Sequence, residues 1–223
     1  GTSTLRLANN SGDFIRAAED ILQIPIHVIS GDEEARYIFL GVSNEIINKE
    51  LGMVIDIGGG STEFAIGDKS QLLVTASIEM GCVNYYERFF ADGKIDSENV
   101  RAAEKAAHLE LEPHLQMLSK HTKNWVAGTS GTLQSLAILA HHLFDDPVNT
   151  LRSASLVELK EKLIHTGHVK DLNFENIDSN RRAILPAGLA IAMAIFTILD
   201  IEQIQICKSA LCEGLLLELS ENL

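Results

Sequence analysis

One stretch, residues 53–67, constrains the fold more than any other, because three successive glycines separate two short apolar segments. Met53–Ile57 is an apolar run broken by one acid, Asp56, and this pattern is typical of a buried strand. The glycines at 58–60 lack a Cβ, so the backbone can turn tightly there and approach a ligand closely. Their N–H groups, with the hydroxyl of Ser61, can face phosphoryl oxygens as a concave anion site. The stretch therefore predicts a hairpin that holds phosphate.

Two other glycine motifs do not fit this stretch. A dinucleotide fingerprint requires a third glycine and a helix, but Glu63 stands at the glycine position and Glu63–Ile66 has an extended pattern. A Walker loop requires Gly-Lys followed by Ser or Thr after four spacer residues, and the chain contains no such motif. The remaining alternative is a glycine hairpin in which Ser61 and Thr62 are purely structural.

Composition and charge limit the class of protein. The chain has 223 residues, of which 46% are hydrophobic, so it can bury the core of one large domain or of two lobes. Its net charge of −13 argues against a nucleic-acid partner, which would need clustered Lys and Arg. The longest apolar run, Ala183–Leu199, contains Pro186 and Gly188 and reads as a buried helix rather than a membrane span.

The cysteines point to a reducing compartment. Cys82, Cys207 and Cys212 make an odd number without the spacing of a metal site, so we expect buried free thiols. The N-terminus has no basic segment followed by an apolar one, which a targeting signal would show. We therefore expect a cytoplasmic protein without a membrane partner.

Hydrophobic periodicity predicts alternating helices and strands. Expected helices cover residues 13–22, 31–42, 85–90, 97–120, 133–143, 156–164, 181–199 and 210–219, and expected strands cover 26–29, 53–57, 62–66, 72–78, 124–127 and 203–207. Pro113 should divide the longest helix. Three strands in a meander followed by alternating helices and strands predict an α/β fold, a ribonuclease-H-like lobe with a mixed sheet. We place this lobe at residues 52–223 and the C-terminal part of an incomplete first lobe at residues 1–51.

A second motif, Ile29–Arg36, lies where an expected strand meets an expected helix. Ser30 and Glu33 have the spacing of a capping box, so Glu33 is interpreted as structural. Glu34 has two interpretations. It can oppose the helix dipole in the first turn, or it can act on a ligand, because α/β folds place ligand chemistry at the ends of strands.

Two further segments can bind anions. Residues 128–132, Gly-Thr-Ser-Gly-Thr, follow a strand and open a helix, so Thr129 and Ser130 can either cap that helix or contact a ligand. Arg6 ends a hydroxyl-rich segment and is either a phosphate contact or a surface charge. The eight histidines form no convincing metal set, whereas Asp56 and Glu63 offer the hard oxygen ligands that suit Mg²⁺.

Four blocks of the chain, Thr2–Ala8, Val28–Arg36, Val54–Glu63 and Gly128–Thr132, are similar to those of a known family. Together they resemble the exopolyphosphatase and guanosine pentaphosphate phosphatase family, within the actin, Hsp70 and sugar-kinase superfamily. The resemblance extends over nearly the whole chain. Met80–Val83 is more similar to the guanosine pentaphosphate phosphatase branch than to the exopolyphosphatase branch.

The resemblance implies a two-lobed, actin-like ATPase fold and a Mg²⁺-assisted phosphohydrolase. Its substrate would be polyphosphate or guanosine pentaphosphate, with guanosine tetraphosphate as the product of the latter, and a homodimer of the full-length protein is compatible with it. Glu34 matches the family's catalytic base, and Asp56 and Glu63 match acids that position metal and water. The residues that the motifs and the resemblance assign to phosphate are Arg6, Gly58, Gly59, Gly60, Ser61, Gly128, Thr129, Ser130 and Arg181.

The chain departs from the family pattern in two places. It begins after the first phosphate loop of the family, so we expect this 223-residue chain to be inactive alone. Cys212 replaces an arginine of the family pattern. Two competing functions stay open: a kinase-like ATPase of the same superfamily, and a noncatalytic module that binds guanosine tetraphosphate.

Overall fold

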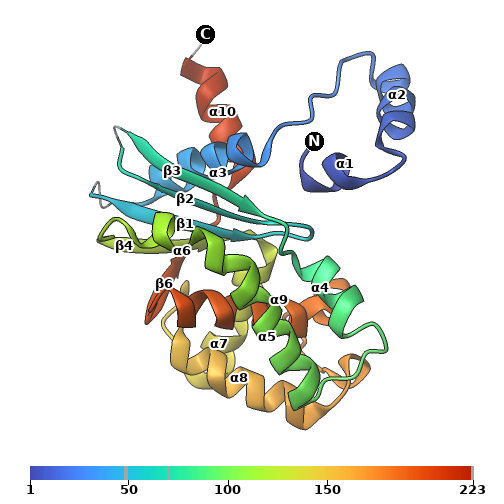
Figure 1. Cartoon of the computed structure of the whole chain (residues 1–223), viewed down its shortest axis with the longest axis vertical. Coiled ribbons are helices and arrows are strands. Elements are labelled where there is room, and N and C mark those ends of the chain that lie inside the picture. Colours follow the sequence, from blue (N-terminus) through green and yellow to red (C-terminus); the bar gives the residue numbers. More distant parts are fainter. Residues whose placement is uncertain (48–49, 70, 222–223) are drawn as a thin grey trace.

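The computed structural model describes residues 1–47, 50–69 and 71–221; residues 48–49, 70 and 222–223 of the two predicted lobes lie outside this description. A six-stranded sheet occupies the centre of the molecule, with strand order β3-β2-β1-β4-β6-β5 (Figure 1). Its strands are β1 (Gly52–Ile57), β2 (Thr62–Gly67), β3 (Leu72–Ile78), β4 (Trp125–Thr129), β5 (Thr150–Arg152) and β6 (Gln203–Ile206).

The sheet is mixed. β1, β2 and β3 pair antiparallel as a meander, β1 and β6 each pair parallel with β4, and β5 pairs antiparallel with β6. This topology confirms the predicted α/β lobe with a mixed sheet. All residues of β1 and β2 are buried, because helices cover both faces of the sheet, and this explains why their apolar runs do not alternate with polar residues.

The helices form two layers on the sheet, except that the first two in the chain lie to one side of it (Figure 1). They are α1 (Ser3–Leu7), α2 (Ser11–Leu22), α3 (Gly31–Glu45), α4 (Cys82–Phe89), α5 (Ser97–Leu111), α6 (Leu115–Ser119), α7 (Ser130–Phe144), α8 (Ser153–Thr166), α9 (Ser179–Ile198) and α10 (Leu211–Glu221). α3 and α10 cover one face, where Val54 and Ala65 join a small hydrophobic cluster. The remaining large helices cover the other face, where Met53, Ile55 and Phe64 join the main core.

α3 and α10 cross at a very short distance. A Cβ on Gly41 would lie 2.3 Å from the carbonyl oxygen of Ala210, and a Cβ on Gly214 would lie 1.9 Å from that of Tyr37. Glycine is therefore required on both helices where they meet. Glu218 of α10 also accepts hydrogen bonds from Arg36 and from the hydroxyl of Tyr37, so the two helices are joined by polar contacts beyond the crossing.

Three expectations need correction. Residues 26–29 form no strand, because the described residues offer them no neighbouring strand; Ile29 N donates instead to Gly1 O. β5 was not predicted, since it has three residues and follows a polar turn with positive φ at Asp145 and Asn149. Cys212 is exposed, whereas Cys82 and Cys207 are buried as expected. The predicted break at Pro113 is confirmed, as a 3₁₀ turn, Glu112–His114, separates α5 from α6.

α9 is the one helix among the described residues that is long and apolar enough to cross a membrane. Within the fold, however, 61% of its apolar window is buried, and α9 packs against α4, α5 and α7. This burial explains its hydrophobicity as that of a core helix, in agreement with the sequence interpretation.

Candidate active site

Backbone hydrogen bonds, within the turn and from the start of α4, fix the glycine loop between β1 and β2. Gly58 N donates to Ser61 O at 2.9 Å and closes the turn. The carbonyl groups of Gly58 and Gly59 accept hydrogen bonds from Cys82 N, at 3.0 Å, and Val83 N, at 2.9 Å, at the start of α4. In the described part of the chain, the N–H groups of residues 59–61 have no protein acceptor. The loop therefore presents a row of free donors, as a phosphate site requires.

Two close contacts fix the shape of this loop. A Cβ on Gly60 would lie 2.6 Å from Ser3 Oγ of α1, and a Cβ on Gly81 would lie 2.2 Å from Gly59 O. The contact at Gly81 is with backbone atoms, which leave no room for a side chain, so this position requires glycine; the contact at Gly60 is with a hydroxyl group that would have to move. The sequence analysis missed the part played by Gly81, which no local pattern connects with the glycine loop.

Three carboxylates gather beside the loop. Asp56 on β1 and Glu63 on β2 are directly opposite in the antiparallel register, and Glu34 lies in the first turn of α3. Asp56 and Glu63 are 9% and 3% exposed. Burial, together with the charge of Glu34, raises the pKa of Asp56 to about 6 and that of Glu63 to about 7. Ser77 Oγ donates to Glu63 Oε1 at 2.8 Å and supports its ionised form.

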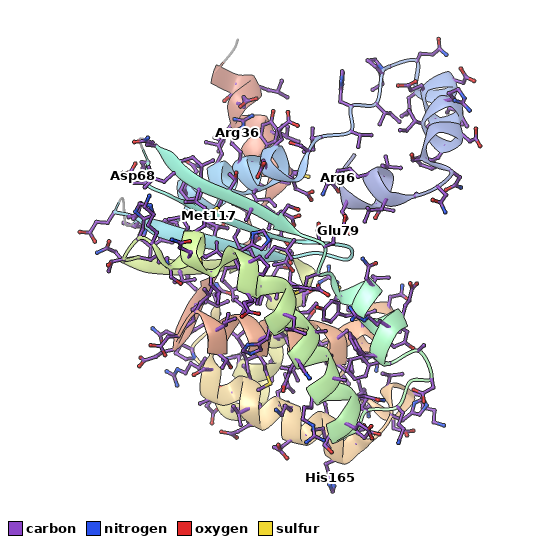
Figure 2. All side chains as sticks on the ribbon, viewed as in Figure 1. Arg6, Arg36, Asp68, Glu79, Met117 and His165 are labelled. Atoms are coloured by element: carbon purple, nitrogen blue, oxygen red, sulfur yellow. The ribbon has the colours of Figure 1, made fainter. Side chains whose placement is uncertain are left out.

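Glu34 is paired with Arg6. Arg6 Nη1 donates to Glu34 Oε2 at 3.0 Å and to Ile29 O at 2.9 Å. Arg6 of α1 and Glu79 after β3 lie at the same end of the sheet (Figure 2), where they line a cavity of about 290 Å³ together with Ser61. The structure thus brings Arg6 to both the glycine loop and Glu34, and its predicted phosphate contact stays a prediction.

The predicted capping box at the start of α3 is present. Ser30 Oγ accepts from Glu33 N at 3.2 Å, and Glu33 Oε2 accepts from Ser30 N at 2.8 Å. The Glu33 carboxylate is therefore hydrogen-bonded at the N-terminal end of α3, as part of the cap. Its neighbour Glu34 instead points toward Arg6, which agrees with the different roles predicted for these two acids.

The two hydroxyl groups of the turn before α7 donate hydrogen bonds to backbone carbonyl groups of the protein. Thr129 Oγ1 donates to Ser209 O at 2.8 Å, and Ser130 Oγ donates to Ile57 O at 2.9 Å, so neither caps α7. Ser130 adopts a φ of 72°, an uncommon conformation for a residue with a side chain. The first N–H groups of α7 have no acceptor within the helix and are available to an anion.

A cavity of about 200 Å³ connects this turn with the glycine loop. Gly58, Gly59, Ser130 and Arg181 line it, and Arg181 lies so close to Gly131 that a Cβ there would be 2.8 Å from its Cζ. The other predicted phosphate residues of this turn lie behind the cavity: Thr129 is fully buried, and Gly128 faces the core side chains of Leu133 and Ile204.

The donor set fits Mg²⁺. Asp56 and Glu63 supply hard oxygen ligands, and a cation beside them would offset the cost of ionising buried carboxyl groups. No group of three His, Cys, Asp or Glu side chains within the described residues forms a complete metal cluster. This suits an ion that keeps several of its waters and needs only one or two carboxylates.

The buried carboxyl groups predict how stability depends on pH. The pKa values of Asp56 and Glu63 lie above their ordinary values of 3.8 and 4.5, so the folded state binds these protons more tightly than the unfolded chain does. Their contribution to the free energy of unfolding should therefore fall as pH rises from about 4 to about 7, by on the order of 2 kcal/mol per carboxyl group. Urea titrations across this range without divalent cations will measure it.

The matched control is the double variant that carries both Asp56→Asn and Glu63→Gln, because it has no titratable group at either position. Glu33, Asp96 and Glu218 have lowered pKa values and contribute the opposite slope, so the difference between wild type and variant is the quantity to compare. Parallel stability curves for the two proteins would contradict the prediction.

Known proteins share both the sequence pattern and the fold. The model of the Ppx/GppA phosphatase family matches residues 1–223. An exopolyphosphatase from Cytophaga hutchinsonii is 23% identical with a TM-score of 0.86, over 100% of this chain and 74% of that chain. The Aquifex aeolicus PPX-GPPA enzyme is 22% identical with a TM-score of 0.80, over 97% of this chain and 73% of that chain.

The structural likeness confirms the actin-like fold class that the sequence predicted, and the family match confirms the resemblance. The glycine loop, the acidic residues beside it and the turn before α7 thus lie in a phosphatase fold. The chain belongs to the Ppx/GppA phosphatase family.

Proposed function

We propose that the protein releases orthophosphate from guanosine pentaphosphate, giving guanosine tetraphosphate, or from the end of inorganic polyphosphate. The observation that carries this proposal is the placement of Glu34, Asp56 and Glu63 beside a glycine loop with free N–H groups. Phosphoryl transfer needs donors for the phosphoryl oxygens and an acid beside the attacking water, and this arrangement supplies both.

Two anion sites would hold the substrate. The N–H groups of residues 59–61 face the reacting phosphate, and the first turn of α7, with Arg181, receives the phosphates beyond it. The side chains of Arg6 and Ser61 border the neighbouring cavity, on the side where Glu34 lies. The reacting phosphorus would therefore lie between the two cavities, with water on the Glu34 side and the leaving group on the Arg181 side.

Glu34 would orient and deprotonate the attacking water. Arg6 holds Oε2 of its carboxylate, whereas Oε1 has no donor among the described residues and is free to accept a proton from water. A positioned carboxylate of this kind raises the rate through both orientation and proton transfer.

Asp56 and Glu63 would hold Mg²⁺, which neutralises charge on the phosphoryl oxygens when bound. Asp56→Asn and Glu63→Gln should each raise the Mg²⁺ concentration needed for half-maximal phosphate release, because each removes one ligand from a site with few protein ligands. A Mg²⁺ titration of phosphate release checks this. If both variants needed the same Mg²⁺ concentration as the wild type, these two acids would have a structural role and would not bind the metal.

The lining of the cavity beside Arg181 favours a nucleotide over a bare polyphosphate. Besides its polar groups, the cavity beside Arg181 is lined by Ile57, Cys82, Ile184 and Leu185. Apolar side chains next to an arginine suit a nucleobase, whereas a polyphosphate chain offers them no apolar surface. Phosphate release by the full-length protein from guanosine pentaphosphate and from polyphosphate, measured side by side, tests the whole proposal; no release from either substrate would contradict it.

A noncatalytic module that binds guanosine tetraphosphate is the second candidate. The ion pair between Arg6 and Glu34 favours it, because that pair occupies one oxygen of the expected base. Tight binding of guanosine tetraphosphate without turnover of either substrate would identify this case. For either function we propose a cytoplasmic location, which suits the free thiols of Cys82, Cys207 and Cys212.

A further inference from the structure

The last turn of α3 carries an acidic residue, Glu45, where helix electrostatics disfavour a negative charge. The C-terminal end of a helix has a partial negative charge, so an acid there is unfavourable unless it has a partner. Glu45 finds partners in the loop after β6: its carboxylate accepts hydrogen bonds from Lys208 N at 3.1 Å and from Ser209 N at 2.9 Å. Two successive N–H groups that converge on one carboxylate hold it as a small anion nest.

The same loop is joined on its other side to the turn before α7. Cys207 N donates to Gly128 O at 2.9 Å, and Thr129 Oγ1 donates to Ser209 O at 2.8 Å. Ser209 is therefore bound through its N–H group to Glu45 and through its carbonyl group to Thr129. A continuous path of hydrogen bonds connects the end of α3 with the start of α7.

The turn at the end of this path contains an unfavourable backbone conformation. Ser130 follows Thr129 directly and has a φ of 72°, a conformation that persists only where the surrounding structure fixes it. Its neighbour Gly131 packs under the guanidinium group of Arg181, at the wall of the cavity that connects this turn with the glycine loop. A shift of Thr129 would therefore move the N–H groups that face this cavity.

We propose that Glu45 is a positioning residue for the anion-binding first turn of α7, acting through the backbone of Ser209 and the hydroxyl of Thr129. This inference rests on the proposed function, which places phosphate at that turn. α3 would then position both ends of the site, since it carries Glu34 in its first turn and Glu45 in its last. Because the turn contacts phosphates that do not react, its displacement should raise KM and leave kcat nearly unchanged.

The test compares Glu45→Gln with the wild type by amide hydrogen exchange and by pyrophosphate binding in a calorimeter. Both N–H groups donate to the same oxygen, Oε2, and an uncharged amide oxygen accepts more weakly than a carboxylate, so the nest is weakened. We expect exchange of the amides of residues 128–132 to accelerate and pyrophosphate to bind more weakly, each by about 3- to 10-fold, as the replacement of charge-assisted hydrogen bonds by neutral ones predicts. The variant should keep its fold, since Glu45 is exposed.

Two further variants make the result specific. Glu104 of α5 forms an ion pair with Lys160 of α8. Glu104→Gln also removes one negative charge, and it should change neither the amide exchange nor the pyrophosphate binding. Thr129→Val breaks the far end of the path, so its effect and that of Glu45→Gln should be less than additive in the double variant. Additive effects would overturn the proposal, as would unchanged exchange of residues 128–132 in Glu45→Gln.

The exchange measurement needs no substrate and therefore separates this inference from the proposed function. A protein that releases no phosphate and binds no pyrophosphate would contradict the proposed function alone. The exchange rates of residues 128–132 would still show whether Glu45 holds the turn.

Discussion

In the full-length protein, Glu34→Gln should lower the rate of phosphate release by about 10²- to 10⁴-fold, the usual contribution of a positioned acid or base. The amide keeps the size of the side chain and can still accept a hydrogen bond from Arg6, but it cannot take a proton from water. The fold should change little, because Glu34 lies in the first turn of α3 and not in the core. Single-turnover phosphate release with saturating Mg²⁺ measures the effect on the chemical step.

Glu33→Gln is the matched control. Glu33 is adjacent in sequence, but its carboxylate caps α3 through Ser30, whereas that of Glu34 accepts a hydrogen bond from Arg6. This variant should lose about 1 kcal/mol of stability and keep its rate of phosphate release. If Glu34→Gln released phosphate at nearly the wild-type rate, Glu34 would have no part in the reaction.

Gly81→Ala should reduce phosphate release by roughly 10²-fold, because a Cβ there would lie 2.2 Å from Gly59 O and push the glycine loop by roughly 1 Å. Gly81 has a φ of −123° and a ψ of 154°, which alanine also adopts, so the effect comes from the contact alone. The added methyl group should destabilise the fold by about 1–3 kcal/mol as an overpacking substitution. Phosphate release and a urea titration measure the two effects separately.

Gly12→Ala is the control for a glycine substitution as such. A Cβ on Gly12 meets only the end of the Arg16 side chain, at 3.7 Å, and Gly12 lies in the exposed helix α2. This variant should keep full activity and gain slightly in helix stability. Equal activities of the Gly81→Ala and Gly12→Ala variants would show that the position of the loop does not matter for the reaction.

The features predicted correctly are those that neighbouring residues determine. The β1–β2 hairpin and its glycine turn are contained in residues 52–67, so one short pattern of apolar residues and glycines predicts them. The capping box of Ser30 and Glu33 is local in the same way. The Mg²⁺ ligands and the base, by contrast, stay predictions, because their assignment depends on ligands rather than on the chain's own conformation.

The features that were missed depend on residues far apart in the sequence. Arg6 and Glu34 are 28 residues apart, and neither motif indicated that they form an ion pair. Gly81 is required by the carbonyl group of Gly59, which no local pattern reveals. The expected strand at residues 26–29 has the right composition, but a strand also needs a neighbour, and the sequence does not show where the neighbours lie.

The crossing of α3 and α10 bears on the order in which the site forms during synthesis. Arg36 and Glu218, which join these helices, are 182 residues apart, and contacts of such separation form late because a long loop must first close. The ribosome makes α3 early and α10 near the end of the described chain, so α3 can pack on β2 and β3 well before its second partner, α10, exists. A nascent chain that already contains the complete glycine loop and α3 therefore still lacks the contacts of α10, which complete the packing of the helix that carries Glu34.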